Sequence, residues 1–165
     1  MTLANRITLA RIALIPLCVI LLLTGFLGLA AVVFLVLSLS DAIDGYVARK
    51  YNQVSELGKM LDPLADKILV MTVLIGLTGI GKADPLPVML ICAREFLVAS
   101  IRSKRIFAAS QLAKWKTVSQ IAAILMLMFG LPLSGVVLWF SVLLSLISGV
   151  AYIWQSPLFK QLKLN

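Results

Sequence analysis

The chain has 165 residues, of which 61% are hydrophobic and only 13% are charged, and its mean hydropathy is +1.05. Soluble domains are about half apolar and about a quarter charged, so this composition excludes an ordinary water-soluble globule and also a disordered chain. It is typical of a protein that lies mostly in lipid. Residues 1–165 are expected to form a single membrane domain.

Positive charge dominates the polar residues, with 15 Lys and Arg against 7 Asp and Glu. The basic residues lie in short segments between apolar runs, which favours anionic headgroups or phosphorylated substrates over nucleic acid as partners. The chain contains no histidine. This absence excludes Ser-His-Asp and Cys-His nucleophiles and the common histidine-bearing zinc sites.

Six apolar runs follow one another along the chain, and each approaches the ~20 residues that a helix needs to cross a bilayer core. Short segments rich in glycine or proline separate the first run from the second, the third from the fourth and the fifth from the sixth. The sequence therefore predicts an all-α bundle of six transmembrane helices, and Gly76, Gly79 and Gly81 are expected to allow close packing in the third. The runs cover about residues 8–25, 28–48, 60–80, 86–106, 116–132 and 135–154.

The distribution of basic residues predicts the orientation of these helices. Of the 15 Lys and Arg, only Lys82 maps to one side of the membrane, and Lys67 and Arg94 fall inside apolar runs. All the others map to the opposite side, which the positive-inside rule assigns to the cytoplasm. We therefore expect a multi-pass protein of the cell membrane with both termini in the cytoplasm.

Four of the 7 acidic residues form two pairs at the cytoplasmic ends of neighbouring helices. Asp41 and Asp44 are three positions apart and Asp62 and Asp66 are four apart, so each pair shares one helix face. Four carboxylates at one depth repel one another by several kcal/mol unless positive charge stands among them.

Two sources of that positive charge are open. The acids could form plain salt bridges with Arg49, Lys50, Lys59 and Lys67. Alternatively, they could hold divalent cations, because ligand sets made only of oxygen select Mg²⁺, Mn²⁺ or Ca²⁺ over zinc. Two such ions about 4 Å apart suit displacement at phosphorus.

The spacing of these acids resembles the signature of the CDP-alcohol phosphatidyltransferases. Residues 41–66 reproduce D-x2-D-G-x2-A-R-x8-G-x3-D-x3-D. Further segments resemble the branch of that family that uses glycerol 3-phosphate, although Ala113 stands where that branch often has glycine. These segments are Asn5–Arg11, Asp62–Lys67, Arg94-Glu95-Phe96 and Lys114–Thr117.

The resemblance implies a role for each residue of the signature. It implies that Asp41, Asp44, Asp62 and Asp66 hold two divalent cations, Mg²⁺ or Mn²⁺, and that Asp66 is also the general base. It further implies that the CDP group binds near the signature, where Gly45, Ala48 and Gly58 leave room for the nucleotide and Arg49 faces its diphosphate or base. The residues expected to bind CDP are Asp41, Asp44, Gly45, Ala48, Arg49 and Gly58.

The acceptor is expected to bind in a polar cavity that opens to the cytoplasm. Arg94 is the strongest candidate for its phosphate, with Lys116 and Arg102 as further candidates. The alternative for these basic residues is that they anchor the protein to anionic lipids.

The resemblance implies transfer of a phosphatidyl group from CDP-diacylglycerol to sn-glycerol 3-phosphate by a homodimer. Inositol phosphate, serine or phosphatidylglycerol remain open as the acceptor. A divalent-cation transporter is the alternative from another class, but it would need acids near the bilayer middle or lining both the inner and the outer half of the membrane. In the outer half the sequence offers only Asp84, in a predicted loop.

Overall fold

The computed structural model describes residues 3–50, 56–102 and 111–155, and the side chains within 8–40, 64–100 and 114–151. This part of the chain is helical and contains no strand. The expected all-α architecture is confirmed, and each helix covers one of the predicted apolar runs. The helices are α1 (Leu3–Leu23), α2 (Leu27–Lys50), α3 (Glu56–Gly79), α4 (Pro85–Arg102), α5 (Gln111–Met128) and α6 (Ser134–Gln155).

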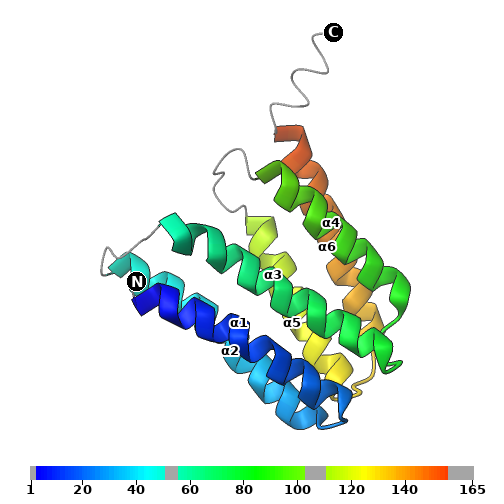
Figure 1. Ribbon diagram of the computed structural model, residues 1–165. Helices are drawn as coiled ribbons and strands as arrows, with labels where there is room; N and C mark the ends of the chain where they lie inside the picture. Colours follow the sequence, from blue (N-terminus) through cyan, green and yellow to red (C-terminus); the bar gives the residue numbers. More distant parts are fainter. Residues whose placement is uncertain (1–2, 51–55, 103–110, 156–165) are drawn as a thin grey trace.

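The helices run back and forth between two ends of the molecule (Figure 1). The short turns that join α1 to α2, α3 to α4 and α5 to α6 lie at one end. The end of α2, the start of α3, the end of α4 and the start of α5 lie at the other, together with the start of α1 and the end of α6. The backbone thus gathers both halves of the acidic signature at one end of the bundle.

Three helices end in the same way, because a glycine follows each of them in the left-handed region of φ. After α1, the Phe26 N–H donates to the carbonyl oxygen of Leu21 (2.9 Å) and the Gly25 N–H to that of Leu22 (3.2 Å). This pair of bonds satisfies carbonyl groups that a helix end would otherwise leave unpaired. The same pair closes α3 and α5. The glycines are Gly25, Gly81 and Gly130, with φ of 87°, 72° and 63°.

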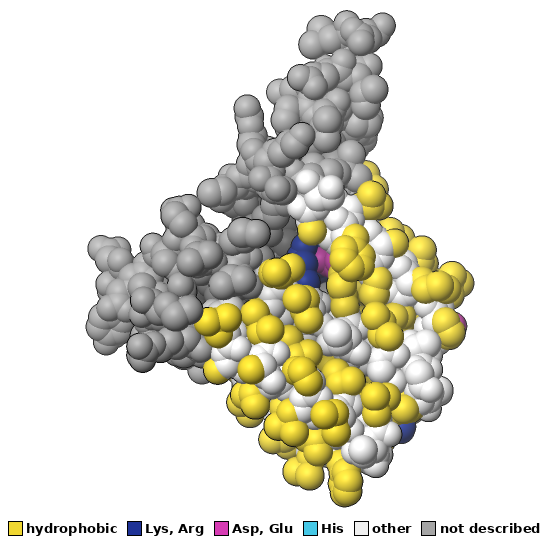
Figure 2. Space-filling model, in the orientation of Figure 1, with side chains coloured by type: hydrophobic (Ala, Val, Ile, Leu, Met, Phe, Trp, Pro, Cys, Tyr) yellow, Lys and Arg dark blue, Asp and Glu magenta, His cyan; other side chains and the backbone are white. Residues whose placement is uncertain are grey.

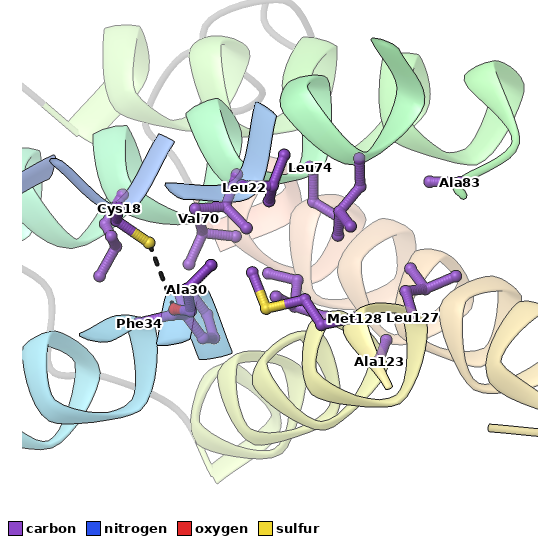
Figure 3. Close-up of a cluster of buried hydrophobic side chains, with 14 of the residues drawn as sticks. Cys18, Leu22, Ala30, Phe34, Val70, Leu74, Ala83, Ala123, Leu127 and Met128 are labelled. Carbon is purple, nitrogen blue, oxygen red and sulfur yellow. Dashed lines mark hydrogen bonds between the residues drawn. The ribbon is translucent and has the colours of Figure 1, made fainter. Parts of the chain in front are cut away.

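A continuous apolar core joins the helices, and Figure 3 shows part of it. Cys18 and Leu22 of α1 meet Phe34 of α2 and Leu74 of α3, and Met128 of α5 packs into the same cluster. α5 packs most extensively against α6, α1 packs against α3 and α2, and α4 packs against α6. α6 thus contacts both α4 and α5, the helices that carry most of the polar residues described below.

The outward faces of the helices are also apolar, and yellow side chains cover much of the described surface in Figure 2. Large side chains such as Ile20, Val36, Phe96 and Leu143 are more than half exposed. Within the described part of the chain, one helix is long and apolar enough by itself to cross a membrane, over Ser134–Ala151. Shorter apolar stretches cover Thr8–Leu23 and Leu27–Ser40.

The three glycines expected to allow close packing behave differently. A Cβ atom at Gly76 would lie 3.0 Å from the Cδ2 atom of Leu22, so this glycine does let α1 approach α3. At Gly79 a Cβ atom would meet nothing within 4 Å, and the packing role expected for it is wrong. Gly81 lies in the turn after α3, where its positive φ is what favours glycine.

Candidate active site

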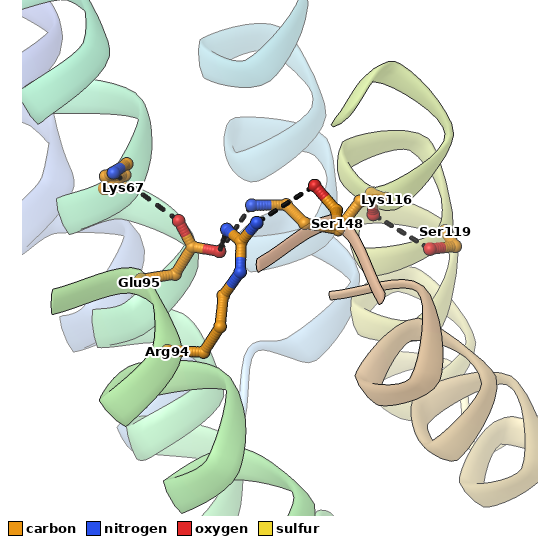
Figure 4. A network of polar contacts seen from close by, with 6 residues as sticks. All are labelled: Lys67, Arg94, Glu95, Lys116, Ser119 and Ser148. Atoms are coloured by element: carbon orange, nitrogen blue, oxygen red, sulfur yellow. Dashed lines mark hydrogen bonds and ion pairs between the residues drawn. The ribbon is translucent and has the colours of Figure 1, made fainter. Parts of the chain in front are cut away.

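The buried carboxylate of Glu95, on α4, forms ion pairs with three cationic side chains (Figure 4). Arg94 donates from Nη1 to Glu95 Oε1 over 2.8 Å. Lys116 of α5 donates from Nζ to the same oxygen. Lys67 of α3 places its Nζ atom 3.6 Å from Oε2. We call these four residues the Glu95 cluster.

The cluster is shielded from solvent and keeps a surplus of positive charge. The exposed fractions of the side chains are 5% for Glu95, 10% for Arg94, 10% for Lys116 and 21% for Lys67. One carboxylate cannot balance three cations, so two positive charges remain within the cluster. Such a surplus in a shielded place attracts an anion more strongly than the same charges would in water.

The cluster reaches the surface at a restricted place. Figure 2 shows dark blue and magenta side chains together at one spot of the described surface, and further charged side chains only towards the right-hand edge of the view. Lys67, with its 21% exposure, is the most accessible member. A small charged molecule would therefore meet the cluster beside α3, the helix that carries the second pair of signature aspartates.

The cluster is directly linked to the acidic signature through α3. Asp66, the residue before Lys67, is half-buried, and Asp62 lies one helical turn earlier. Figure 1 shows the end of α2, which carries Asp41 and Asp44, close to the start of α3. The backbone therefore brings the two acidic pairs to one end of the bundle, as the spacing predicts.

Most of the predicted nucleotide and metal residues lie where the structure describes the backbone but not the side chains. Among residues with described side chains, no three acids, cysteines or histidines come together as a metal-binding group, and Asp66 is the one member of the acidic set that falls there. The residues outside this description are Asp41, Asp44, Gly45, Ala48, Arg49, Gly58, Asp62 and Arg102.

The contacts of Lys67, Arg94 and Lys116 bear on two alternatives for the basic residues, salt bridges to the signature acids and anchoring to lipid headgroups. Lys67 pairs with Glu95 of another helix, so salt bridges to the signature acids do not account for its position by themselves. Arg94 and Lys116 are buried and hydrogen-bonded, which does not suit an anchor that reaches for lipid headgroups.

Several residues of the site are more important than sequence reasoning suggested. The sequence places Glu95 in a segment that resembles the family but predicts no role for it, although an acid within an apolar run is itself a signal of function. Ser148 of α6 accepts a hydrogen bond from Arg94 Nη2 (3.0 Å), and nothing in its sequence context marks it. Arg11 of α1, for which the sequence predicts no role in the site, is 2% exposed and donates to Ser40 of α2, the residue before Asp41.

The chain matches the family model of the CDP-alcohol phosphatidyltransferases over residues 1–147. It belongs to the CDP-alcohol phosphatidyltransferase family. The match covers the acidic signature, Arg94, Glu95 and Lys116.

Relatives similar over most of their length carry consistent names. One from Rickettsia bellii, a CDP-diacylglycerol–glycerol-3-phosphate 3-phosphatidyltransferase, is 41% identical, with 91% of this chain and 92% of the relative covered. A protein of the same name from Bacillus subtilis is 38% identical, with the same two coverages. A probable phosphatidylglycerophosphate synthase from Mycobacterium tuberculosis is 35% identical, covering 92% of this chain and 79% of the relative.

The Glu95 cluster lies next to the acidic signature along the chain. The four aspartates of the acidic signature lie on α2 and α3. Lys67, the first residue of the Glu95 cluster, directly follows the last of them, Asp66. The backbone that carries the acidic signature and the Glu95 cluster therefore lie at the same end of the bundle.

Proposed function

We propose that this phosphatidyltransferase moves the phosphatidyl group of CDP-diacylglycerol to sn-glycerol 3-phosphate, yielding phosphatidylglycerol phosphate and CMP. The names of the relatives from Rickettsia bellii and Bacillus subtilis support both substrates. We further propose that all six helices span the cell membrane, that both termini lie in the cytoplasm, and that two copies form a homodimer. The back-and-forth path of the helices and their apolar outward faces support the first of these.

The observation that carries the proposal is the Glu95 cluster. Glycerol 3-phosphate is a small dianion, and the cluster offers a surplus of two positive charges in a shielded place. Arg94 and Lys116 would bind its phosphate. Arg102, the last residue of α4, is the further candidate for that contact. A guanidinium suits a phosphate because its planar N–H donors can contact two oxygens at once.

The acidic signature would hold the divalent cations and the nucleotide. A set of carboxylates without histidine or cysteine fits Mg²⁺ or Mn²⁺, and Asp41, Asp44, Asp62 and Asp66 would supply it. When bound, such ions neutralise phosphate oxygens and stabilise the charge on a leaving phosphate. The CDP group would lie over Gly45, Ala48 and Gly58, two of which have no side chain, with Arg49 beside it.

Asp66 would accept the proton that the reaction releases between the two halves of this site. In the proposed reaction the 1-hydroxyl oxygen of glycerol 3-phosphate forms a bond to the β-phosphorus of CDP-diacylglycerol. The bond from that phosphorus to the oxygen of CMP breaks, and the hydroxyl proton passes to the Asp66 carboxylate. Asp66 lies beside Lys67 of the cluster and one turn from Asp62, which supports this assignment.

The position of the site suits its two substrates. The donor carries two acyl chains and must enter from lipid, whereas glycerol 3-phosphate must enter from water. A polar cavity at one end of an apolar bundle would admit both. The other acceptors, serine, inositol phosphate and phosphatidylglycerol, are not in the names of these relatives, and family membership does not favour a cation transporter.

The decisive experiment supplies purified protein with labelled glycerol 3-phosphate and CDP-diacylglycerol, and analyses the lipid product with and without Mg²⁺ or Mn²⁺. We expect labelled phosphatidylglycerol phosphate with either ion, and loss of turnover in excess chelator that added ion restores. Serine, inositol phosphate and phosphatidylglycerol serve as competing acceptors. Full activity in excess chelator would contradict the metal assignment, and preference for another acceptor would contradict the substrate.

A further inference from the structure

Arg94 rests against two consecutive residues of α6, Ser148 and Gly149. Ser148 Oγ accepts a hydrogen bond from Arg94 Nη2 over 3.0 Å. A Cβ atom built on Gly149 would lie 3.0 Å from Arg94 Nε, 3.3 Å from Cγ and 3.7 Å from Cδ. The three atoms nearest to this Cβ position all belong to Arg94. Because Gly149 has no side chain, the Arg94 side chain can lie directly against α6.

Together with Glu95, these two residues fix the plane of the Arg94 guanidinium. Glu95 holds Nη1 from α4, Ser148 holds Nη2 from α6, and Gly149 lets the stem and Nε lie close to the α6 backbone. Arg94 Nε is buried and has no hydrogen-bond partner among the described residues. An unpaired buried donor is unfavourable. The site therefore keeps this arginine in one orientation at the expense of one of its hydrogen bonds.

That orientation leaves donors for a ligand. A guanidinium carries five N–H donors, two of them on each terminal nitrogen. One N–H of Nη1 contacts Glu95 and one of Nη2 contacts Ser148, so a second N–H on each nitrogen makes no hydrogen bond to the described side chains. Two donors on adjacent nitrogens match two oxygens of a phosphate only while the plane of the guanidinium is held.

We infer that Ser148 and Gly149 are positioning residues for the acceptor, which set the orientation of Arg94 toward the phosphate of glycerol 3-phosphate. The inference rests on the proposed role of Arg94 in binding that phosphate. Both residues lie beyond residue 147, where the match to the family model ends.

The test compares two substitutions with two matched controls on the same helix. Gly149→Ala and Ser148→Ala should each raise the KM for glycerol 3-phosphate about three- to tenfold, with the KM for CDP-diacylglycerol within about twofold of the parent. Gly135→Ala is the control for the first, because a Cβ atom there would meet nothing within 4 Å. Ser145→Ala is the control for the second, because Ser145 is buried and its Oγ has no partner among the described residues.

The same four substitutions are then made in an Arg94→Ala protein, or in Arg94→Gln should the alanine variant fail to fold. Without the guanidinium, Gly149→Ala and Ser148→Ala should change neither the KM nor the calorimetric binding of glycerol 3-phosphate in the presence of CDP. A full additional loss in that background would overturn the inference, since the effect would not pass through Arg94. An equal loss in the Gly135→Ala or Ser145→Ala controls would overturn it as well.

The design separates failure of the inference from failure of the proposed function. Arg94→Ala alone should raise the KM for glycerol 3-phosphate at least tenfold. If it does and the α6 variants have no effect, Arg94 binds the acceptor but Ser148 and Gly149 do not position it. If Arg94→Ala instead raises the KM for CDP-diacylglycerol, the acceptor assignment of Arg94 is wrong, and the inference is overturned with it.

Discussion

Glu95 determines whether three neighbouring cations form a binding site or repel one another. Arg94, Lys116 and Lys67 come from three different helices, and the Glu95 carboxylate is their shared partner. Buried cations are unfavourable unless they are paired, so this carboxylate stabilises the packing of α3, α4 and α5. It leaves the surplus of positive charge that an anionic substrate can use.

Glu95→Gln tests this double role. The amide keeps the shape but removes the negative charge, so we expect the free energy of unfolding to fall by about 3 kcal/mol. The KM for glycerol 3-phosphate should rise despite the additional net positive charge, because Arg94 and Lys116 would repel each other and lose the positions in which Glu95 holds them. Thermal unfolding in detergent measures the first effect and initial rates the second. Asp84→Asn, the same change in the exposed turn before α4, is the control; an equal unfolding midpoint in both variants would contradict the prediction.

Asp66→Asn tests the proposed general base. An amide cannot accept the hydroxyl proton, so kcat should fall by a factor of about 10²–10⁴ while CDP binding is largely kept. Calorimetric titration with CDP and steady-state rates separate the two properties. Near-normal kcat would exclude Asp66 as the base. Loss of CDP binding together with loss of rate would instead make Asp66 chiefly a metal ligand.

Sequence reasoning found some residues of the site and missed others for physical reasons. Arg94 and Lys67 stand out because each places a charged side chain within an apolar run. Burying such a charge is energetically unfavourable, so it indicates a functional site. The central place of Glu95 depends on which helices pack together, and no local pattern specifies that. Ser148 and Gly149 are ordinary small residues of an apolar helix, so only the path of the Arg94 side chain reveals their contact with it.

At the scale of the helices, their number and order were predictable because apolar runs and glycine-rich turns alternate so regularly. The turns follow from local chemistry, since glycine is the residue that most readily adopts positive φ after a helix. The packing of individual glycines was not predictable, as Gly76 and Gly79 show. Both belong to α3 within one turn, but a Cβ atom meets Leu22 at the first and open space at the second.

The turn after α3 offers a matched pair of substitutions. Gly81→Ala should lower the free energy of unfolding by about 1–2 kcal/mol, because φ at residue 81 is 72°. Gly79→Ala, at the last residue of α3, should be neutral or stabilising by up to ~1 kcal/mol, because alanine favours a helix and meets no neighbour there. Thermal unfolding of both variants checks this. Equal destabilisation by the two substitutions would show that packing, rather than backbone conformation, governs this turn.

The two ends of the bundle differ in the residues and connections that they contain. One end has three short turns closed by glycines, and the other has the acidic signature and both ends of the described chain. Lys82 lies in a turn at the first end, whereas Lys114 lies near the start of α5 at the second. Both side chains are exposed, so they can report on which end faces the cytoplasm.

Cysteine labelling in intact cells tests the proposed orientation. In a Cys18→Ala and Cys92→Ala background, Lys82→Cys should react with a membrane-impermeant maleimide added outside. Lys114→Cys should react only after the cells are permeabilised, because the positive-inside rule places that end in the cytoplasm. Labelling of Lys114→Cys from outside would reverse the orientation and place the proposed site on the wrong side for cytoplasmic glycerol 3-phosphate.

The contact between Arg94 and α6 also determines when the site is completed during synthesis. The aspartates are carried by α2 and α3, which the ribosome makes early, whereas Ser148 and Gly149 belong to α6, the last helix within the described residues. A nascent chain that has released only five helices already has the acidic signature but lacks the residues against which Arg94 rests. The surroundings of Arg94 are therefore complete only when α6 packs against α4, after the residues of the acidic signature have been synthesised.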